Sequence, residues 1–583
     1  MNRILKPVTF AFGLATVLPL AAPAIAQSEL PSREEVNPAV PQQEVRKGSA
    51  TVDDNRAFDA GPCPLAESDV RVAIREVRFT APGGGELAPE LATRLAGIGT
   101  SAEQQPIRVV CDLRDQANMR LRSARYVASV QIPPQRIEDG VLRLEVISGR
   151  ITEVRVRGDA GPFENLIKDR IEQLKALTPL NAEAAERILL LADDVPGLNV
   201  QLGLSPDTSG GRPGDLVGEL TVDFRRYSVV GNVQNYNSKQ LGRESIYLRS
   251  ELYGLLGSGD RTFFALSSTF DFEEQRIAQV GQSITLNGAG DRLSITATYA
   301  ESRPDLETID LRTRSLIGNI EFQHTVTRSV NETVDAALGF EWAQQRTRVF
   351  GAAGSVPLSR DRISTFYARA SADRRKLNFD GSQAWQLGGF LEVRQGVGIL
   401  GSTKTGAISG GYGPSRFEGN SRATVMRGEL KGAIGFGPIF ELAAALRGQA
   451  AKGPLLNYDE FAVGNLTVGR GYDPGANTGD RAVAGSHEVR ANLALGQNAK
   501  AQLYGFFDWV KLWNLDTSST EANRTLKSVG GGVRMTLFNA MRLDLTYARP
   551  LDPPLLTGVN IKRAPDRFMF SLTSQIIPFG SRR

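Results

Sequence analysis

The sequence predicts a transmembrane β-barrel of about 16 antiparallel strands, preceded by two α+β modules. Three features predict this fold class. The chain begins with an export signal, no later run of about eighteen apolar residues could form a spanning helix, and long stretches beyond residue 225 alternate apolar and charged side chains. Because successive side chains of a strand point to opposite faces, this alternation is typical of a wall between lipid and a wet lumen.

The first 26 residues have the pattern of a secretory signal peptide. Arg3 and Lys6 precede an apolar run from about residue 8 to residue 20, and small residues lead up to Ala26. Cleavage after Ala26 would place the mature protein outside the cytoplasm.

Residues 27–68 are polar, and their composition predicts a flexible linker because prolines end any helix that begins there. These prolines are Pro31, Pro38 and Pro41. The chain has two cysteines, Cys63 and Cys111, and an even count in an exported protein predicts a disulfide between them. In the chain-entropy view such a bond stabilises the fold by roughly 4 kcal/mol. The alternative is two unrelated thiols.

Residues 69–149 predict a first α+β module. Its order is a strand, two helices and two strands, expected at about 70–80, 89–96, 110–125, 126–137 and 141–147. Asp139 and Gly140 separate the last two runs, and this dipeptide between alternating segments is a strong hairpin signal.

Residues 150–224 repeat the same order, which predicts a second module in tandem. The first helix of this module carries an apolar stripe with helical spacing, formed by Phe163, Ile167, Ile171 and Leu174. Asn181 is placed to cap the second helix, and the strands are expected at about 151–157, 198–204 and 216–224.

The pattern of residues 225–583 predicts the barrel, because apolar residues no longer recur with the period of a helix and instead alternate with polar ones. Leu248 and Leu252, for example, alternate with Arg249 and Glu251. A soluble β-sandwich also alternates and is the alternative. Charges of both signs on the polar face, and short connections that alternate with long ones, favour a barrel with periplasmic turns and extracellular loops. Sixteen strand-like runs, the first near 226 and the last near 566, return both barrel ends to the same side.

The connection at 456–485 follows the eleventh run and is long and rich in glycine. Arg470 and Tyr472 lie at its centre, among Gly469, Gly471 and Gly475. Glycine permits positive φ and a close approach of the backbone, so we expect this loop to fold into a confined space. The alternative is an ordinary surface loop.

With these features the chain resembles a two-partner secretion transporter of the TpsB (haemolysin secretion/activation) type, within the outer-membrane protein-85 superfamily. Two POTRA (polypeptide-transport-associated) modules before a sixteen-stranded barrel are the layout of that family. The motifs that carry the resemblance are Arg470-Gly471-Tyr472, similar to the family's Arg-Gly-aromatic loop tip, and Phe506-Phe507-Asp508, similar to its Phe-x-Asp barrel motif. The resemblance implies that the loop folds inward and that Arg470 meets Asp508 on the inner wall as a latch, beside Gly471, Tyr472 and Phe506.

The resemblance also implies a function. It predicts an outer-membrane transporter in a Gram-negative-type cell that exports, and in some members activates, an unfolded partner exoprotein through its barrel. The POTRA modules would recognise this substrate in the periplasm. The expected partners are the exoprotein and outer-membrane lipid, and the barrel is expected to be monomeric. An outer-membrane barrel-assembly factor is the alternative, although two modules are few for that class.

Other features bear on binding and catalysis. The exposed edge near residues 126–132 could add a strand of cargo by β-augmentation, and the candidate residues are Tyr126, Ser129, Gln131 and Gln135. The alternative is that these residues only build the module. With 68 basic and 64 acidic residues, the charge is too balanced for a nucleic-acid binder.

We expect no enzyme activity, catalytic residue, metal or cofactor, because the chain has only two histidines and no Gly-x-Ser-x-Gly elbow. Many relatives close the pore with an N-terminal helix. The prolines of the segment 27–60 argue against such a plug here.

Overall fold

The computed structural model describes residues 30–38, 62–65, 67–99, 102–209, 211–306, 309–378, 381–475, 477–517, 523–554 and 562–577. The expected signal peptide, 1–26, lies outside these residues. Within them, none of the helices has the length and apolar character needed to cross a membrane.

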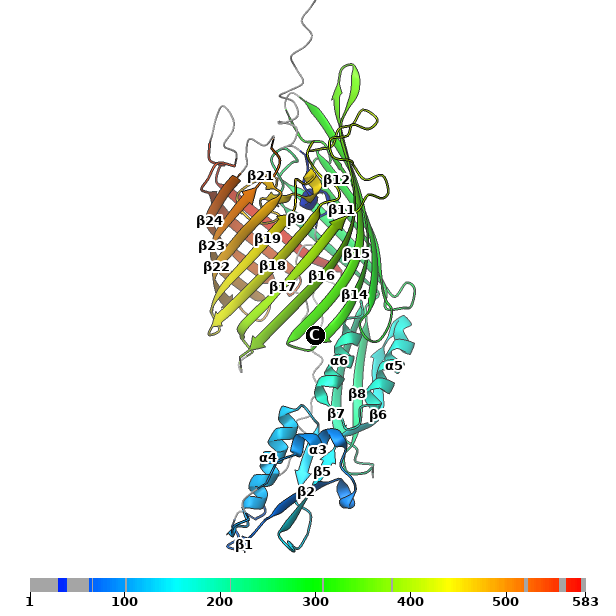
Figure 1. The fold of residues 1–583 in the computed structure, drawn as a ribbon, viewed down its shortest axis with the longest axis vertical. Helices are drawn as coiled ribbons and strands as arrows, with labels where there is room; N and C mark the ends of the chain where they lie inside the picture. Colours follow the sequence, from blue (N-terminus) through cyan, green and yellow to red (C-terminus); the bar gives the residue numbers. More distant parts are fainter. Residues whose placement is uncertain are drawn as a thin grey trace, which may run out of the picture.

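Sixteen of the described strands close a barrel (Figure 1). Each strand pairs with its neighbours in chain order, and β9 also pairs with β26, which closes the ring. The barrel strands are β9 (Tyr227–Gln234), β10 (Ser245–Tyr253), β11 (Arg261–Thr269), β12 (Gln275–Thr285), β13 (Arg292–Ser302), β14 (Asp310–Arg328), β15 (Glu332–Gly351), β16 (Gly354–Leu377), β17 (Gln383–Gly396), β18 (Thr424–Phe436), β19 (Phe440–Ala451), β22 (Arg481–Ala494), β23 (Ala499–Trp513), β24 (Asn523–Leu537), β25 (Met541–Pro550) and β26 (Arg567–Ile577). The predicted sixteen-stranded antiparallel barrel is confirmed.

The two faces of the wall differ as the alternation predicted. On β10, Leu248 is 41% exposed on the outer face, whereas the neighbouring Arg249 is 5% exposed and points into the barrel. Arg249 donates a hydrogen bond to Glu251, 2.7 Å away on the same inner face. The apolar face can therefore contact lipid, and charges of both signs line the lumen.

The first module is a three-stranded sheet in the order β2-β5-β4, covered by two helices. Its elements are β1 (Arg71–Val72), β2 (Glu76–Thr80), η1 (Pro82–Gly84), α3 (Pro89–Leu95), β3 (Gln105–Pro106), α4 (Val109–Ser123), β4 (Ala128–Gln131) and β5 (Val141–Ser148). The strand expected at 70–80 is divided into β1 and β2. The strand expected at 126–137 ends at Gln131, because Pro133 and Pro134 follow and cannot donate backbone hydrogen bonds. Cys63 and Cys111 form a disulfide, with 5.8 Å between the Cα atoms, that ties the segment before β1 to α4.

The second module repeats this arrangement with the sheet order β6-β8-β7. Its elements are β6 (Arg150–Asp159), η2 (Gly161–Phe163), α5 (Glu164–Lys175), α6 (Ala182–Asp193), β7 (Leu198–Pro206) and β8 (Asp215–Phe224). Asn181 caps α6 as expected, because its side chain accepts hydrogen bonds from the N–H groups of Glu183 and Ala184.

The two modules are joined to each other and to the barrel. Between the modules, the N–H of Val127 donates to the carbonyl of Leu180 at 3.0 Å, and Val127 packs in the core of the second module. At the barrel, Arg328 donates two hydrogen bonds to Asp194, at 2.7 and 2.8 Å. The second module is therefore attached to the turn between β14 and β15.

Candidate functional site

The connection between β19 and β22 folds back into the barrel. It contains η3 (Asn457–Asp459) and a hairpin of β20 (Phe461–Val463) and β21 (Asn477–Gly479). At its tip Gly469 and Gly471 have φ of 96° and 94°, values that favour glycine. A Cβ atom on Gly471 would approach Pro550 to 3.0 Å and Ala548 to 3.1 Å, so a side chain there would crowd the tip against β25.

Arg470 contacts two carboxylates on the facing wall, those of Asp508 and Glu488. Its Nη2 and Nε atoms donate to the two oxygens of Asp508, at 2.7 and 2.9 Å, and its backbone N–H donates to Asp508 Oδ2 at 3.0 Å. Its Nη1 donates to Glu488 Oε1 at 2.5 Å. The guanidinium also lies 3.7 Å above the ring of Phe506. This two-point contact with one carboxylate is the geometry that arginine provides and lysine does not.

The register of β22 and β23 explains how these acceptors meet. Ser486 lies opposite Asp508 and Glu488 lies opposite Phe506, all with side chains on the lumen face. Ser486 Oγ donates to Asp508 and accepts from Arg470. Burial lowers the pKa of Arg470, but the two carboxylates raise it more, so its pKa is above its usual range and the arginine is charged.

The network continues through residues that sequence reasoning missed. Arg534 of β24 donates to both oxygens of Glu488, each at 2.9 Å, and its guanidinium lies 3.8 Å above the ring of Tyr504. Arg490 of β22 also donates to Glu488, at 2.7 Å. The only available signal was that charged residues occupy the lumen face of these strands. Their mutual contacts depend on strand register, which the spacing in the sequence does not give.

Tyr472 fixes the tip at a second place. It is fully buried and packs with Val463, Val510 and Leu526. Its hydroxyl lies 2.9 Å from the carbonyl of Lys527 and 3.0 Å from that of Asp552, so it can donate to one of these acceptors.

Arg416, from the connection between β17 and β18, holds the neck of the same loop. This buried arginine donates to Asp480 at 2.5 Å, to the carbonyl of Leu455 at 2.9 Å, and forms ion pairs with Glu460 at 2.9 Å and with Asp516 at 2.7 Å. Burial raises the pKa of Glu460 to about 7, because a buried carboxylate loses hydration. Three connections on the loop side of the barrel therefore meet at one cation.

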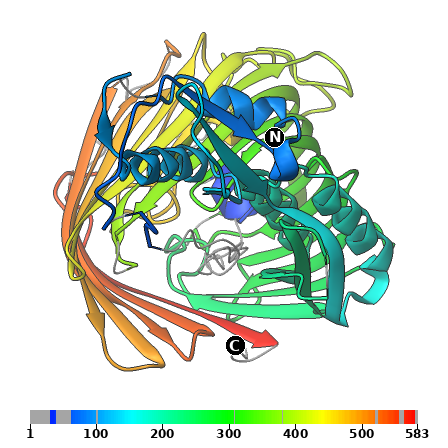
Figure 2. The same cartoon turned by 90° about the horizontal axis from the view of Figure 1, so that it is seen from below.

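Residues 30–38 lie inside the barrel, and the expectation of a flexible linker is wrong for them. Their short helix α2 (Arg33–Val36) lies within the ring of strands (Figure 2). Arg33 contacts Glu341 and Val36 is fully buried in an inward-facing apolar cluster. The carbonyl of Pro31 accepts from Gln345 at 3.0 Å. The prolines leave space for one helical turn, and inward apolar residues from several strands provide a surface that the sequence alone did not reveal.

Glu35 makes the docking of this segment sensitive to pH. Its Oε2 accepts from Ser32 N at 2.8 Å and from Ser32 Oγ at 2.9 Å, and burial raises its pKa to about 7. A carboxyl with a raised pKa stabilises the docked state below its ordinary pKa, and this contribution is lost as pH rises through about 7. We therefore expect docking to weaken by up to about tenfold per pH unit between the ordinary carboxyl pKa and about 7, and to change little above that value.

Channel conductance in planar bilayers between pH 5.5 and 8.5 would measure this effect. The open fraction of the wild type should rise with pH, whereas Glu35→Gln, which is neutral throughout, should keep the low-pH behaviour. An identical rise in both proteins would show that Glu35 is not the group responsible.

The four candidate recognition residues all have contacts within the first module or at its junction with the second. Tyr126 forms a backbone bridge with Asn181 at the junction between modules, and Ser129 is buried. Gln131 donates to Ser129 at 3.0 Å. Gln135 donates to the carbonyl of Arg143 at 2.5 Å and accepts from its N–H at 2.9 Å.

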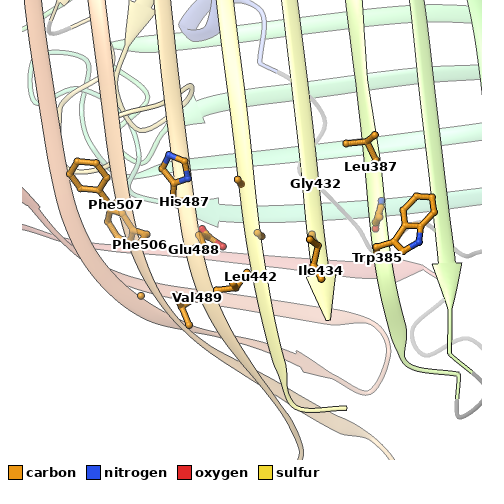
Figure 3. A pocket seen from close by; sticks show the side chains of 15 residues that line it. Trp385, Leu387, Gly432, Ile434, Leu442, His487, Glu488, Val489, Phe506 and Phe507 are labelled. Carbon is orange, nitrogen blue, oxygen red and sulfur yellow. The ribbon is translucent and has the colours of Figure 1, made fainter. Parts of the chain in front are cut away.

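A hollow of about 820 Å³ lies on the outer surface of the wall, across strands β17, β18, β19, β22 and β23 (Figure 3). Its exposed side chains are mostly apolar, including Leu387, Ile434 and Val489. His487 there accepts a hydrogen bond from Trp509 Nε1 at 3.3 Å. Among the residues that the structure describes, no three His, Cys, Asp or Glu side chains are grouped as a metal site. The hollow is part of the lipid-facing surface.

Known proteins resemble this chain in both sequence and fold. The sequence profile of a family described as haemolysin secretion/activation protein ShlB/FhaC/HecB matches residues 221–535. The chain is 23% identical over 456 residues to the heme/hemopexin transporter protein HuxB of Haemophilus influenzae, covering 73% of this chain and 74% of that protein. It is 23% identical over 460 residues to the outer membrane transporter CdiB-2 of Burkholderia pseudomallei, covering 73% of this chain and 71% of that protein.

Two solved structures have the same fold. The structure of CdiB from Escherichia coli aligns with a TM-score of 0.67 at 14% identity, over 89% of this chain and 93% of that one. The structure of CdiB from Acinetobacter baumannii aligns with a TM-score of 0.60 at 15% identity, over 96% of this chain and all of that one (100%).

Proposed function

Because this chain belongs to the haemolysin secretion/activation protein family ShlB/FhaC/HecB, we propose that it exports a specific secreted partner protein through its own barrel. Its family is one of outer-membrane transporters in Gram-negative bacteria and not of enzymes. Members secrete partner exoproteins. The finer proposal is that the partner passes unfolded through the lumen, and that one chain, which closes a complete barrel, acts as a monomer.

One observation carries the proposal of a gated lumen. The inward loop, held by Arg470, and the N-terminal segment, held by Arg33, both lie inside the barrel. A passing polypeptide needs this space, so export requires that at least one of them moves. Besides the apolar packing of Tyr472 and Val36, both are attached by charged and hydrogen-bonding contacts. Such polar contacts can exchange with water or with a polar substrate.

The periplasmic modules are proposed to receive the partner at the outer edge of β4. There Asn118 Oδ1 accepts a hydrogen bond from the N–H of Val130 at 2.8 Å. An incoming strand would replace this side chain and pair with the same backbone group. The side chain of Asn118 also protects this strand edge from unspecific pairing when no partner is present.

The experiment compares the secreted proteins of cells with and without this gene. Loss of one extracellular protein supports the proposal, whereas a loss of many outer-membrane barrels would favour the assembly-factor alternative. In the same assay Val130→Pro, which removes the N–H at the β4 edge, should reduce export. Asn118→Ala is the comparison variant: it leaves the N–H of Val130 in place and free to pair, so export should be preserved. Unchanged export by Val130→Pro would exclude recognition at this edge.

A further inference from the structure

Strands β14, β15 and β16 are longer than the rest of the barrel wall. They contain 19, 20 and 24 residues, and none of the other described barrel strands exceeds 15. The β15–β16 hairpin extends beyond the wall on the side of the long loops (Figure 1). Their extended ends carry six arginines, which are Arg312, Arg314, Arg346, Arg348, Arg360 and Arg362. We call these six residues the arginine patch.

The arginine patch faces away from the lumen. On β15 the lumen-facing residues are odd-numbered, as Glu341 shows by its ion pair with the lumen residue Arg394 at 2.7 Å. Arg346 and Arg348 are even-numbered and therefore point outward. Strand pairing places Arg314 opposite Arg346, and Arg346 opposite Arg360, so three guanidinium groups form one row across three strands.

A second row lies beside the first, since Arg312 is opposite Arg348. Like charges directly opposite each other destabilise a sheet unless counter-charges are present. Two carboxylates supply part of this compensation: Glu301 lies 2.8 Å from Arg314, and Asp310 lies 2.7 Å from Arg312.

The other arginines contact neutral groups. Arg362 donates to Gln344, Arg360 donates to Ser409, and Arg348 donates to Tyr412. Arg346 is half-buried, and the two carboxylates that pair with the patch contact Arg314 and Arg312 instead. The patch therefore has more positive charge than its described surroundings neutralise.

The position of the patch relative to the membrane indicates what it binds. Below it, on the same outward face, Tyr299 and Leu316 are each 42% exposed. Phe366, four residues after Arg362 on β16, is 52% exposed. The hydroxyl of Tyr299 points toward the patch, donating to Glu301 at 2.7 Å. Aromatic residues with polar tips mark the boundary between hydrocarbon and headgroups in outer-membrane barrels. The arginines therefore lie at the level of the headgroups of the outer leaflet.

We propose that the arginine patch binds the phosphate groups of a phosphorylated glycolipid in the outer leaflet. The planar guanidinium binds phosphate at two points and is weakly hydrated, so it is suited to this contact. The patch is on the lipid side of the wall, whereas an exported acidic polypeptide would pass on the lumen side. Bound lipid would neutralise the two arginine rows and hold the extended hairpin against the membrane surface.

The test measures binding of lipid A to the purified full-length protein in detergent micelles. The triple variant Arg314→Gln, Arg346→Gln and Arg360→Gln removes the first row. We expect its dissociation constant for diphosphorylated lipid A to be at least tenfold higher than that of the wild type, and the affinity of the wild type to fall as salt increases. The triple variant Arg78→Gln, Arg155→Gln and Arg157→Gln is the control, because it removes the same charge from exposed ion pairs on the modules. It should change the dissociation constant by less than twofold.

Three results would overturn the proposal. The first is equal affinity of the wild type and the first triple variant, with both proteins verified as folded by their heat-dependent gel mobility. The second is equal binding of lipid A from which the phosphates have been removed. The third is displacement of lipid A by inorganic phosphate or by polyglutamate at equal charge concentration, which would identify a free-anion site or a site for acidic polypeptides.

Discussion

Arg470→Ala is expected to reduce secretion of the partner protein at least tenfold while the barrel still folds. The substitution leaves Asp508, which is 1% exposed, without its main cation, and releases Glu488 from one of its three arginines. Removing one partner of a buried ion pair typically destabilises by about 3–5 kcal/mol. This loss of stability should affect the loop tip and not the barrel wall, because the strands of the wall keep their backbone hydrogen bonds. Arg470→Lys should restore secretion only partly, since an ammonium cannot contact both oxygens of Asp508 in the same plane.

Secretion of the partner protein would be measured in cells, and folding of the barrel would be measured by gel mobility before and after boiling. Asp508→Ala should impair secretion to a similar degree, and the double variant should be little worse than either single one, because both remove the same contact. Arg249→Ala is a matched control: this arginine also contacts a carboxylate and lies 3.6 Å above an aromatic ring, Phe263, but it joins only residues of the wall. Full secretion by Arg470→Ala, or additive losses in the double variant, would contradict a latch.

Arg416→Met is expected to open the neck of the same loop. Methionine replaces much of the volume but leaves Asp480, Glu460 and Asp516 without their shared cation. Asp480 is fully buried and also accepts from the N–H groups of Leu455 and Leu515, both at 2.7 Å. We expect a local loss of about 3–5 kcal/mol, by the same reasoning on buried pairs. The connections at 398–420, 452–480 and 514–517 should then become accessible together.

Limited proteolysis of intact cells from outside would measure the opening of the neck. Cleavage in these connections should increase at least tenfold for Arg416→Met, and adding Asp480→Asn should partly reverse the increase by removing a buried charge. Arg422→Met is the control, because Arg422 belongs to the same connection and is exposed. Arg470→Ala should leave this protease pattern nearly unchanged, since it acts at the tip. Equal cleavage of Arg416→Met and the control would show that Arg416 does not hold the neck.

Much of the architecture was predictable because it depends on local patterns. Alternation such as that of Leu248 and Arg249 depends only on the period of a strand, and it predicted the barrel and its two faces. The repeated order of strands and helices predicted two modules. Arg470 and Asp508 were singled out by their resemblance to family motifs, and the structure brings them into contact. Their role as a latch stays a prediction.

The tertiary structure decided the features that depend on which strands become neighbours. Glu488 and Arg534 meet because β22, β23 and β24 pair in one particular register, and Arg314, Arg346 and Arg360 form a row for the same reason. Residues 30–38 are polar and interrupted by prolines, which locally predicts a linker. They are ordered by side chains from strands more than two hundred residues away, such as Gln275 and Gln345. The sequence determined how each strand presents its side chains; closure of the barrel determined which of them meet.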